Sequence, residues 1–445
     1  MRSYNLNIPI YIGVLFSLST FILFRFGVWD FPLRNNFYLT LYVIILNAFM
    51  YFGFRLGTSA KRFKLTNKKY DKKSQKVILN FVNIVVIVTI FTAIPRFIVQ
   101  TGFYDFNFSF LIDRIIYGLT DASMAYSMNR EKISIFGFWS YINIFLVLTG
   151  FMSYLFIPIS IIFWHKLRRS VKYFFVFYIF LQIMQNLSRG TNFGVFDLLI
   201  QIAIFFLIRR YYLFPKSKKR KPIGKRKTWI YLLLLLIVLF AYFSNTMGTR
   251  VGDHYTRLLP MLGNNINIRS DSLIWNILPD SLKGSFATLN AYVSHGYVGL
   301  GLAFDIPFNS TFGLGNSWFT IMNFEEITGI NLLEYTYHYK IYETFNYHYG
   351  GYWHTAYLWF ANDVSLLLVP FVLFILMFVY GSAWKDFIIN RNIFALLFMS
   401  TFVLFFTFIS ANNQVFSSSN SLFTFWVTLI IWKLTSRQQY FWNCI

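Results

Sequence analysis

Runs of about 20 apolar residues recur along this chain and constrain its fold more than any other feature. A helix of that length crosses the ~30 Å hydrocarbon core of a bilayer with its backbone polar groups paired. We predict an all-α, polytopic membrane helix bundle, and we expect Pro158 to kink the long fourth run. The ten predicted spans are Ile8–Phe24, Asn36–Leu56, Val77–Pro95, Ile133–Trp164, Tyr173–Leu187, Asn192–Ile208, Thr228–Phe243, Thr355–Gly381, Ile393–Ser410 and Ser421–Leu434.

The composition points to the same class of protein. Only 13% of the residues are charged and 56% are hydrophobic, whereas soluble domains carry roughly 25% charged residues. This balance argues against a soluble globular enzyme and against a disordered chain. The single cysteine, Cys444, allows no intramolecular disulfide.

The positive charges predict an orientation. Lysine and arginine number 40 against 17 aspartate and glutamate residues. They gather around Leu65, at 166–172, at 209–227 and in the connection Ser382–Asn392, which lie on one side if the spans alternate. By the positive-inside rule that side is cytoplasmic. We therefore expect a multi-pass membrane protein with both termini cytoplasmic, whose basic loops contact anionic lipid rather than nucleic acid.

The longest connection between spans divides the chain into three parts. We predict an N-terminal membrane bundle at 1–243, a large extracytoplasmic loop at 244–354 and a C-terminal membrane bundle at 355–445. The loop is expected to be helical, with Ser285–Phe304 apolar enough to lie at the membrane surface. Its aromatic residues suit either a carbohydrate platform or an interfacial belt, and both interpretations stay open. They include Tyr335, Tyr337, Tyr339, Tyr342, Tyr347, Tyr349, Tyr352 and Trp353.

A few arginines fall outside the basic connections. Arg189 follows a short span in the string Ser188-Arg189-Gly190, while Arg250, Arg257 and Arg269 open the large loop. Clustered guanidinium groups can hold a diphosphate by bidentate hydrogen bonds. The alternatives are snorkelling of Arg189 or an ion pair with Asp197 that helps pack the helices, and plain solvation of the loop arginines.

Histidines concentrate in the large loop as well. Five of the six histidines lie there, namely His254, His295, His338, His348 and His354. Histidine can act as a general base near neutral pH. The spacing fits no zinc motif, and the chain has no phosphate-binding loop or dinucleotide fingerprint, so we expect neither a metal nor another cofactor. Asp363, in the eighth span, and Tyr292 are further candidates.

Three strings of residues resemble the Wzy-type oligosaccharide repeat unit polymerases and, more distantly, the O-antigen ligases. They are Ser188-Arg189-Gly190, the pair formed by Tyr292-Val293-Ser294-His295-Gly296-Tyr297-Val298-Gly299-Leu300 and Gly313-Leu314-Gly315-Asn316-Ser317, and the pair formed by His354-Thr355-Ala356-Tyr357-Leu358 and Ala361-Asn362-Asp363. The order of these strings agrees over roughly residues 170–385.

The resemblance implies a metal-independent membrane glycosyltransferase of the GT-C type that builds O-antigen or capsule polysaccharide at the outer face of a bacterial inner membrane. The donor would be an oligosaccharide on undecaprenyl pyrophosphate, and the acceptor would be the terminal sugar hydroxyl of another lipid-linked unit. His354 takes the place of the acceptor base, with His295 as a second candidate. Arg189, with Arg250, Arg257 and Arg269, would hold the pyrophosphate. A chain-length regulator is an implied partner.

Two other functions remain open from the sequence. One is a flippase for the lipid-linked unit, although the long outer loop disfavours a transporter. The other is a ligase-type glycosyltransferase with a different acceptor, because an acceptor site is defined by shape and aromatic residues rather than by a motif.

Overall fold

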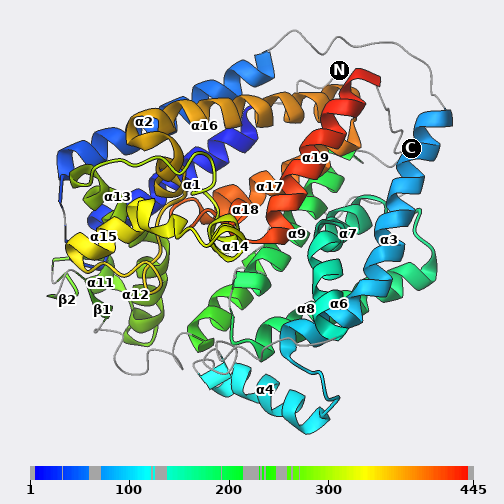
Figure 1. Ribbon diagram of the computed structural model, residues 1–445, viewed down its shortest axis with the longest axis horizontal. Coiled ribbons are helices and arrows are strands. Elements are labelled where there is room, and N and C mark those ends of the chain that lie inside the picture. Colours follow the sequence, from blue (N-terminus) through cyan, green and yellow to red (C-terminus); the bar gives the residue numbers. More distant parts are fainter. Residues whose placement is uncertain are drawn as a thin grey trace. The chain divides into compact units, whose positions relative to one another are not determined.

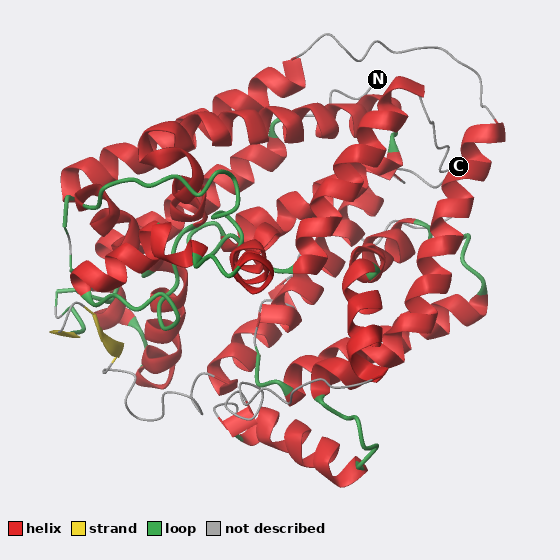
Figure 2. Ribbon diagram, viewed as in Figure 1, coloured by secondary structure: helices red, strands yellow, loops and turns green. Residues whose placement is uncertain are grey.

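The described part of the chain is helical apart from two short strands and the connections between elements (Figure 2). The computed structural model describes residues 6–32, 34–59, 72–121, 124–125, 138–191, 193–213, 230, 233–234, 237–246, 258–261, 264–269 and 271–438. The described residues of 1–68 and 253–439 form one compact unit, here unit 1, and those of 69–252 form unit 2. The predicted division at 243 and 354 stays a prediction.

Unit 1 joins the first two helices to the C-terminal half of the chain (Figure 1). Its helices α1 and α2 are followed, far along the sequence, by the segment predicted as the large loop and by the C-terminal helices. Its elements are α1 (Ile8–Phe26), α2 (Asn36–Ser59), β1 (Leu258–Met261), β2 (Asn264–Ile266), α11 (Leu273–Ile277), α12 (Asp280–Ser294), α13 (Gly296–Leu302), η3 (Ala303–Asp305), α14 (Trp318–Thr328), η4 (Leu332–Tyr335), α15 (Tyr337–Phe345), α16 (Ala356–Asn390), α17 (Ile393–Phe408), α18 (Gln414–Ser417) and α19 (Ser419–Gln438).

Helices α2 and α16 lie side by side along one edge of this unit (Figure 1). A Cβ atom at Gly53 would lie 2.3 Å from the carbonyl oxygen of Phe374, and one at Gly57 would lie 2.2 Å from that of Phe378. Gly381 faces the α2 backbone in the same way. Small residues four apart let two membrane helices approach this closely. The contacts advance together along both helices, so α2 and α16 run parallel, as alternating topology predicts for the second and eighth spans.

Helix α16 is interrupted one-third of the way along. Ser365 has φ 66° and ψ 161°, a conformation that costs a residue with a side chain about 1–3 kcal/mol. The break frees the carbonyl groups of Asn362 and Asp363 from the helix ladder. Thr311 donates both its backbone N–H and its hydroxyl to the Asn362 oxygen, and the Ser310 hydroxyl donates to that of Asp363. The large loop thus supplies the donors that the helix lacks.

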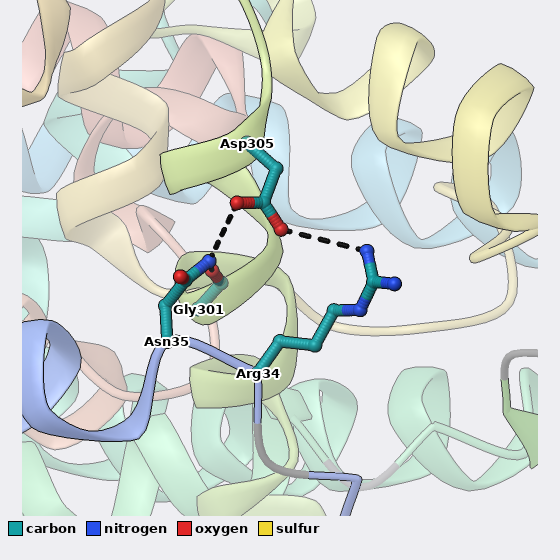
Figure 3. A network of polar contacts seen from close by, with 4 residues as sticks. All are labelled: Arg34, Asn35, Gly301 and Asp305. Atoms are coloured by element: carbon teal, nitrogen blue, oxygen red, sulfur yellow. Dashed lines mark hydrogen bonds and ion pairs between the residues drawn. The ribbon is translucent and has the colours of Figure 1, made fainter.

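The helices of the large loop pack on α1 and α2. Every residue of α13 is buried, and the Tyr297 hydroxyl donates to the Ser17 carbonyl oxygen at 3.2 Å. Asp305 ties the same segment to the start of α2 (Figure 3): its carboxylate accepts a hydrogen bond from Asn35 at 2.9 Å and lies 3.5 Å from the Arg34 guanidinium. The predicted helical character of this loop is confirmed, while its place outside the cytoplasm stays a prediction.

Unit 2 is a second group of helices. Helix α3 packs against α7 and α8, and α4 packs against α8. Helix α8 ends where Gly190 takes φ 59°, a left-handed conformation that glycine adopts without steric cost. The elements are α3 (Lys72–Thr101), α4 (Phe108–Thr120), α6 (Phe138–Leu148), α7 (Gly150–Ile162), α8 (Arg169–Ser188), α9 (Phe193–Ile208) and the π-helical turn η1 (Arg209–Leu213).

Four described helices are long and apolar enough to cross a membrane: α1, α2, Gln75–Thr101 of α3, and α16. The bent pair α6 and α7 adds a fifth if it is one span. These helices indicate a multi-pass membrane protein. The other predicted spans fall on α8, α9, α17, α19 and the short apolar helix Ile237–Thr246, and ten crossings stay a prediction.

Two expectations about helix boundaries are wrong. The fourth apolar run bends by 49° at Thr149 rather than at Pro158, which lies inside α7. The segment 382–390, predicted as a connection, continues α16 to Asn390. Its acidic residue, Asp386, is buried and accepts hydrogen bonds from the side chains of Asn390, Asn392 and Trp432. A carboxylate whose hydrogen bonds are all formed can lie inside a helix, although charged residues led us to end the predicted span before it.

Candidate functional site

The strings around His295 and His354 meet in unit 1 at two glycines. A Cβ atom at Gly296 would lie 2.4 Å from the Ser410 carbonyl oxygen and 3.1 Å from the Thr355 backbone nitrogen. One turn later, a Cβ atom at Gly299 would lie 2.4 Å from Nδ1 of His354. Helix α13 therefore presents a glycine face to the start of α16. These glycines leave the space that the His354 ring fills.

His354 sits directly before α16. Thr355 caps that helix by accepting a hydrogen bond from the Leu358 N–H, which fixes the backbone beside the histidine. The His354 side chain is 3% exposed. Neither of its ring nitrogens has a hydrogen-bond partner among the described residues. Buried polar atoms are nearly always paired, so an unpaired one is a candidate for a functional role.

A second buried histidine lies against the first. The rings of His338 and His354 are 4.4 Å apart between centroids. The Asn362 amide oxygen accepts from the Tyr337 N–H, so its nitrogen faces Nδ1 of His338 at 3.1 Å. Nδ1 then accepts, and the neutral ring carries its proton on Nε2. That Nε2 is buried, and the described residues offer it no partner.

His295 is held differently. Its Nδ1 donates to the Ala291 carbonyl oxygen at 2.6 Å, and its Nε2 accepts from the Trp353 N–H at 2.7 Å. Both nitrogens are therefore used in positioning the residue that precedes His354. Tyr347 joins the two histidines, because its hydroxyl donates to the His295 carbonyl oxygen and its ring meets His354 edge-on at 5.2 Å.

Burial keeps the three histidine rings neutral. It lowers the pKa of His295 to about 4 and that of His338 to about 3. The pKa of His354 falls well below its usual range, because burial removes water and because the two other histidines are close. A neutral imidazole holds a free lone pair at physiological pH, which a proton acceptor needs. The same burial makes each ring a weaker base than imidazole in water.

Asp363 organises the string Gly313–Ser317. One carboxylate oxygen accepts from the Thr311 hydroxyl at 2.6 Å and from the N–H groups of Gly313 and Gly315 at 3.0 and 2.9 Å. The other oxygen accepts from the Asn316 side chain at 2.6 Å. Asp363 thus holds the loop across the break in α16, beside the histidines.

A surface of partly exposed rings leads to the buried histidines. This aromatic surface consists of Trp318, Tyr339, Tyr342, His348 and Tyr349. Trp318 lies 6.5 Å from the Trp359 ring, which lies 4.0 Å from the His338 ring. Tyr292, the remaining aromatic candidate, packs against Trp353 at 5.5 Å.

The two predicted arginines that the structure describes belong to different units. Arg269 belongs to unit 1, where it lies 3.5 Å from Asp30 and 3.9 Å from Asp271 and donates to the Arg25 carbonyl oxygen at 2.7 Å. Arg189 belongs to unit 2, where Nη1 donates to the Gln100 side chain at 3.0 Å. Arg250 and Arg257, and also His254, lie outside the described residues.

Sequence reasoning did not single out two residues of this site, His338 and Gly299. His338 appeared only as one loop histidine among five, and Gly299 only as part of a string, because nothing local tells which rings will touch. Asn362 is the exception: an amide inside an apolar span signals a buried hydrogen-bond network. Across the described ranges, no group of three or more histidine, cysteine or acidic side chains could hold a metal ion.

No family model, no curated protein and no solved structure matches this chain. The assignment of a function therefore depends on the residues and the geometry of the site.

Proposed function

We propose that the protein is a membrane glycosyltransferase that polymerises lipid-linked oligosaccharide repeat units, with His354 acting on the acceptor hydroxyl. One observation carries the proposal: the two ring nitrogens of His354 are buried at the start of a membrane-length helix, without partners among the residues that the structure describes. A ring in this state is suited to receive a hydrogen bond from a substrate. The resemblance of the sequence strings to repeat unit polymerases names the substrate class.

The aromatic surface supports a sugar as that substrate. Tyr342 and Tyr349 lie 5.7 Å apart, and His348 stacks on Tyr349 at 5.1 Å. Aromatic faces pack against the C–H faces of sugar rings, so this surface could hold the acceptor oligosaccharide. Trp318 and Trp359 continue the ring contacts inward to His338, so the aromatic surface adjoins the buried histidines.

The proposed step is a glycosyl transfer. The acceptor hydroxyl gives its proton to a nitrogen of His354 while its oxygen attacks the anomeric carbon of the donor sugar. The bond between that carbon and the pyrophosphate oxygen breaks, and the electron pair leaves with the lipid pyrophosphate. A positioned base adds ~10²–10⁴-fold to such a rate, and fixed positive charge near the leaving group adds more. The resemblance of the sequence strings names Arg189 as one arginine for that role.

The test is a reaction of the purified protein with a defined lipid-linked repeat unit, resolved as a ladder of products. We expect His354→Gln to lower the rate of chain extension by ~10²-fold or more. His165→Gln, a histidine hydrogen-bonded to Arg209 in unit 2, is the matched control and should keep the ladder. Arg189→Ala should leave only the single unit. A normal ladder from both His354→Gln and Arg189→Ala would refute the proposal.

A cellular arm of the test separates the flippase from the polymerase. In a strain that lacks the protein, the lipid-linked unit should accumulate on the outer face of the membrane if polymerisation is lost. Accumulation on the inner face would instead identify a flippase.

A further inference from the structure

The aromatic surface of unit 1 lies in an acidic stretch of a basic chain. The whole chain carries a formal charge of +23, whereas residues 318–353 hold four glutamates and a single lysine, which leaves this stretch at −3. The lysine, Lys340, donates to the Pro307 carbonyl oxygen at 3.1 Å, outside the stretch. Acidic residues contribute little to membrane orientation, so the reversed charge has another origin than topology.

Two of these glutamates act on a ring of the aromatic surface. The pKa of the Tyr339 hydroxyl is raised, first by the negative charge of Glu343 and then by burial and by Glu334. Both glutamates are exposed, and neither forms an ion pair with a lysine or an arginine in the described part of the chain. A ligand with a positive charge would therefore find negative charge beside these rings.

The rings stand in two nearly perpendicular planes. Tyr342 makes an angle of 89° with Tyr349 at 5.7 Å and of 69° with His348 at 4.9 Å, while His348 and Tyr349 stack at 20°. Tyr339 and Trp318 flank Tyr349 at 6.2 and 6.4 Å. Aromatic faces attract cations, and several rings grouped in this way are typical of sites that hold an ammonium group.

The layer beneath the rings holds a hydrogen-bond donor as well. Tyr339 and Tyr349 pack against a buried cluster formed by Ile321, Leu332, Leu333 and Trp359. The Trp359 side chain is 8% exposed, and its indole N–H has no partner among the described residues. Buried donors are as a rule paired. This donor favours a ligand that brings oxygen atoms together with its positive charge.

From these contacts we infer that the aromatic surface binds an amino sugar whose nitrogen is a positively charged ammonium group, with Glu334 and Glu343 balancing that charge. The sugar ring packs on the aromatic faces, and its hydroxyl groups offer acceptors to a buried donor. The site rests on the proposed function for the source of the sugar, because the acceptor repeat unit would then contain an amino sugar without an acetyl group.

The test is isothermal titration calorimetry of the purified full-length chain in neutral detergent, at about pH 6.5, where glutamate is ionised and a primary amine is protonated. The probes are a glucosamine trimer, an N-acetylglucosamine trimer of the same length without the charge, and glycerophosphoethanolamine, a lipid headgroup with an ammonium group. We expect the glucosamine trimer to bind about tenfold more tightly than either of the others. Equal affinity for the two trimers, or tighter binding of glycerophosphoethanolamine, would overturn the inference.

Variants at exposed positions locate the site. The double variant Glu334→Gln/Glu343→Gln should lower the preference for the glucosamine trimer by about threefold, because it removes both charges and keeps the side-chain shapes. Asp271→Asn is the matched control, since this exposed carboxylate of unit 1 lies 3.9 Å from Arg269 instead, and it should keep the full preference. An unchanged preference in the double variant would also contradict the site.

Failure of this site is distinct from failure of the proposed function, because binding needs neither a donor nor turnover. A protein that prefers the glucosamine trimer but forms no ladder of products keeps the site and loses the polymerase. A protein that forms ladders but binds both trimers equally keeps the polymerase and loses the site.

Discussion

Replacing Asp363 by alanine should release the segment 310–316 from α16. The Asp363 carboxylate accepts hydrogen bonds from Thr311, Gly313, Gly315 and Asn316. A hydrogen bond to a charged group contributes about 1.5–3 kcal/mol. Water would replace much of this at the exposed donors, so we expect a net loss of about 3 kcal/mol in the local stability of the segment. That loss corresponds to a roughly 100-fold larger population of the open segment.

Proteolysis measures this opening, because Phe312 is 89% exposed at the tip of the segment and chymotrypsin cleaves after phenylalanine. When the segment opens and closes faster than it is cut, the cleavage rate follows the open population. Mass spectrometry of the fragments identifies cleavage at this bond. We expect Asp363→Ala to be cleaved about 100-fold faster than the unaltered chain.

The control exchanges the side chains of Asp363 and Asn316. Asp363→Asn keeps the oxygen that accepts three of the hydrogen bonds, but it turns a second amide nitrogen toward Asn316. Its effect should be smaller than that of alanine, and the double variant Asp363→Asn/Asn316→Asp should restore slow cleavage. Equal rates for the unaltered chain and Asp363→Ala would refute the role given to this carboxylate.

Three further predictions concern the histidines and the helix pair. Gly299→Ala should displace the His354 ring, since the new Cβ atom would lie 2.4 Å from Nδ1. In the ladder assay, chain extension should slow, while the oligosaccharide should still bind to the aromatic surface. Equal turnover by the variant and the unaltered chain would contradict this prediction. Acidification should destabilise unit 1: the unfolded chain binds protons at histidine near pH 6.5, whereas folded His295 and His338 have pKa values of about 4 and 3, so stability is full above pH 6.5 and falls as the pH drops below it. Unfolding at pH 5 should cost about 2 kcal/mol less per histidine, and His338→Gln should reduce the slope of unfolding temperature against pH. Gly57→Leu should separate α2 from α16 and lower the unfolding temperature by several degrees, whereas Leu56→Phe, on an exposed position of α2, should have little effect; similar values for the two variants would contradict the close packing.

The sequence predicted the fold where the physics is local. Apolar run lengths located α1 and α2 within a few residues and the beginning of α16 within one, because spanning a bilayer depends on composition alone. The bend at Thr149 and the extension of α16 through Asp386 depend on which distant groups pack or donate there. A single sequence does not carry that information.

The candidate site, too, could be predicted from the sequence only in part. His354 was selected because it matches the histidine of the resembled family at the beginning of this span, and the structure places it in a buried cluster. That His338 touches it, while His295 has both nitrogens engaged, follows from the packing of α13 and α15 against α16. The loop that closes over Asp363 could not be predicted for a similar reason. Its glycines are typical of any flexible turn, and the sequence does not show which carboxylate their N–H groups bind.

The parallel packing of α2 on α16 has a consequence for how the protein is made. The Tyr42 hydroxyl donates to the Leu366 carbonyl oxygen across 324 positions of the chain. At ~5–20 residues per second, the ribosome needs on the order of half a minute to produce the second helix after the first. During that interval the face of α2 that carries Gly53 and Gly57 must remain in the bilayer without α16, exposed to lipid or to a chaperone. Completion of unit 1 is therefore a late event in biogenesis. A truncated chain would leave this face of α2 uncovered in the membrane rather than a half-folded core.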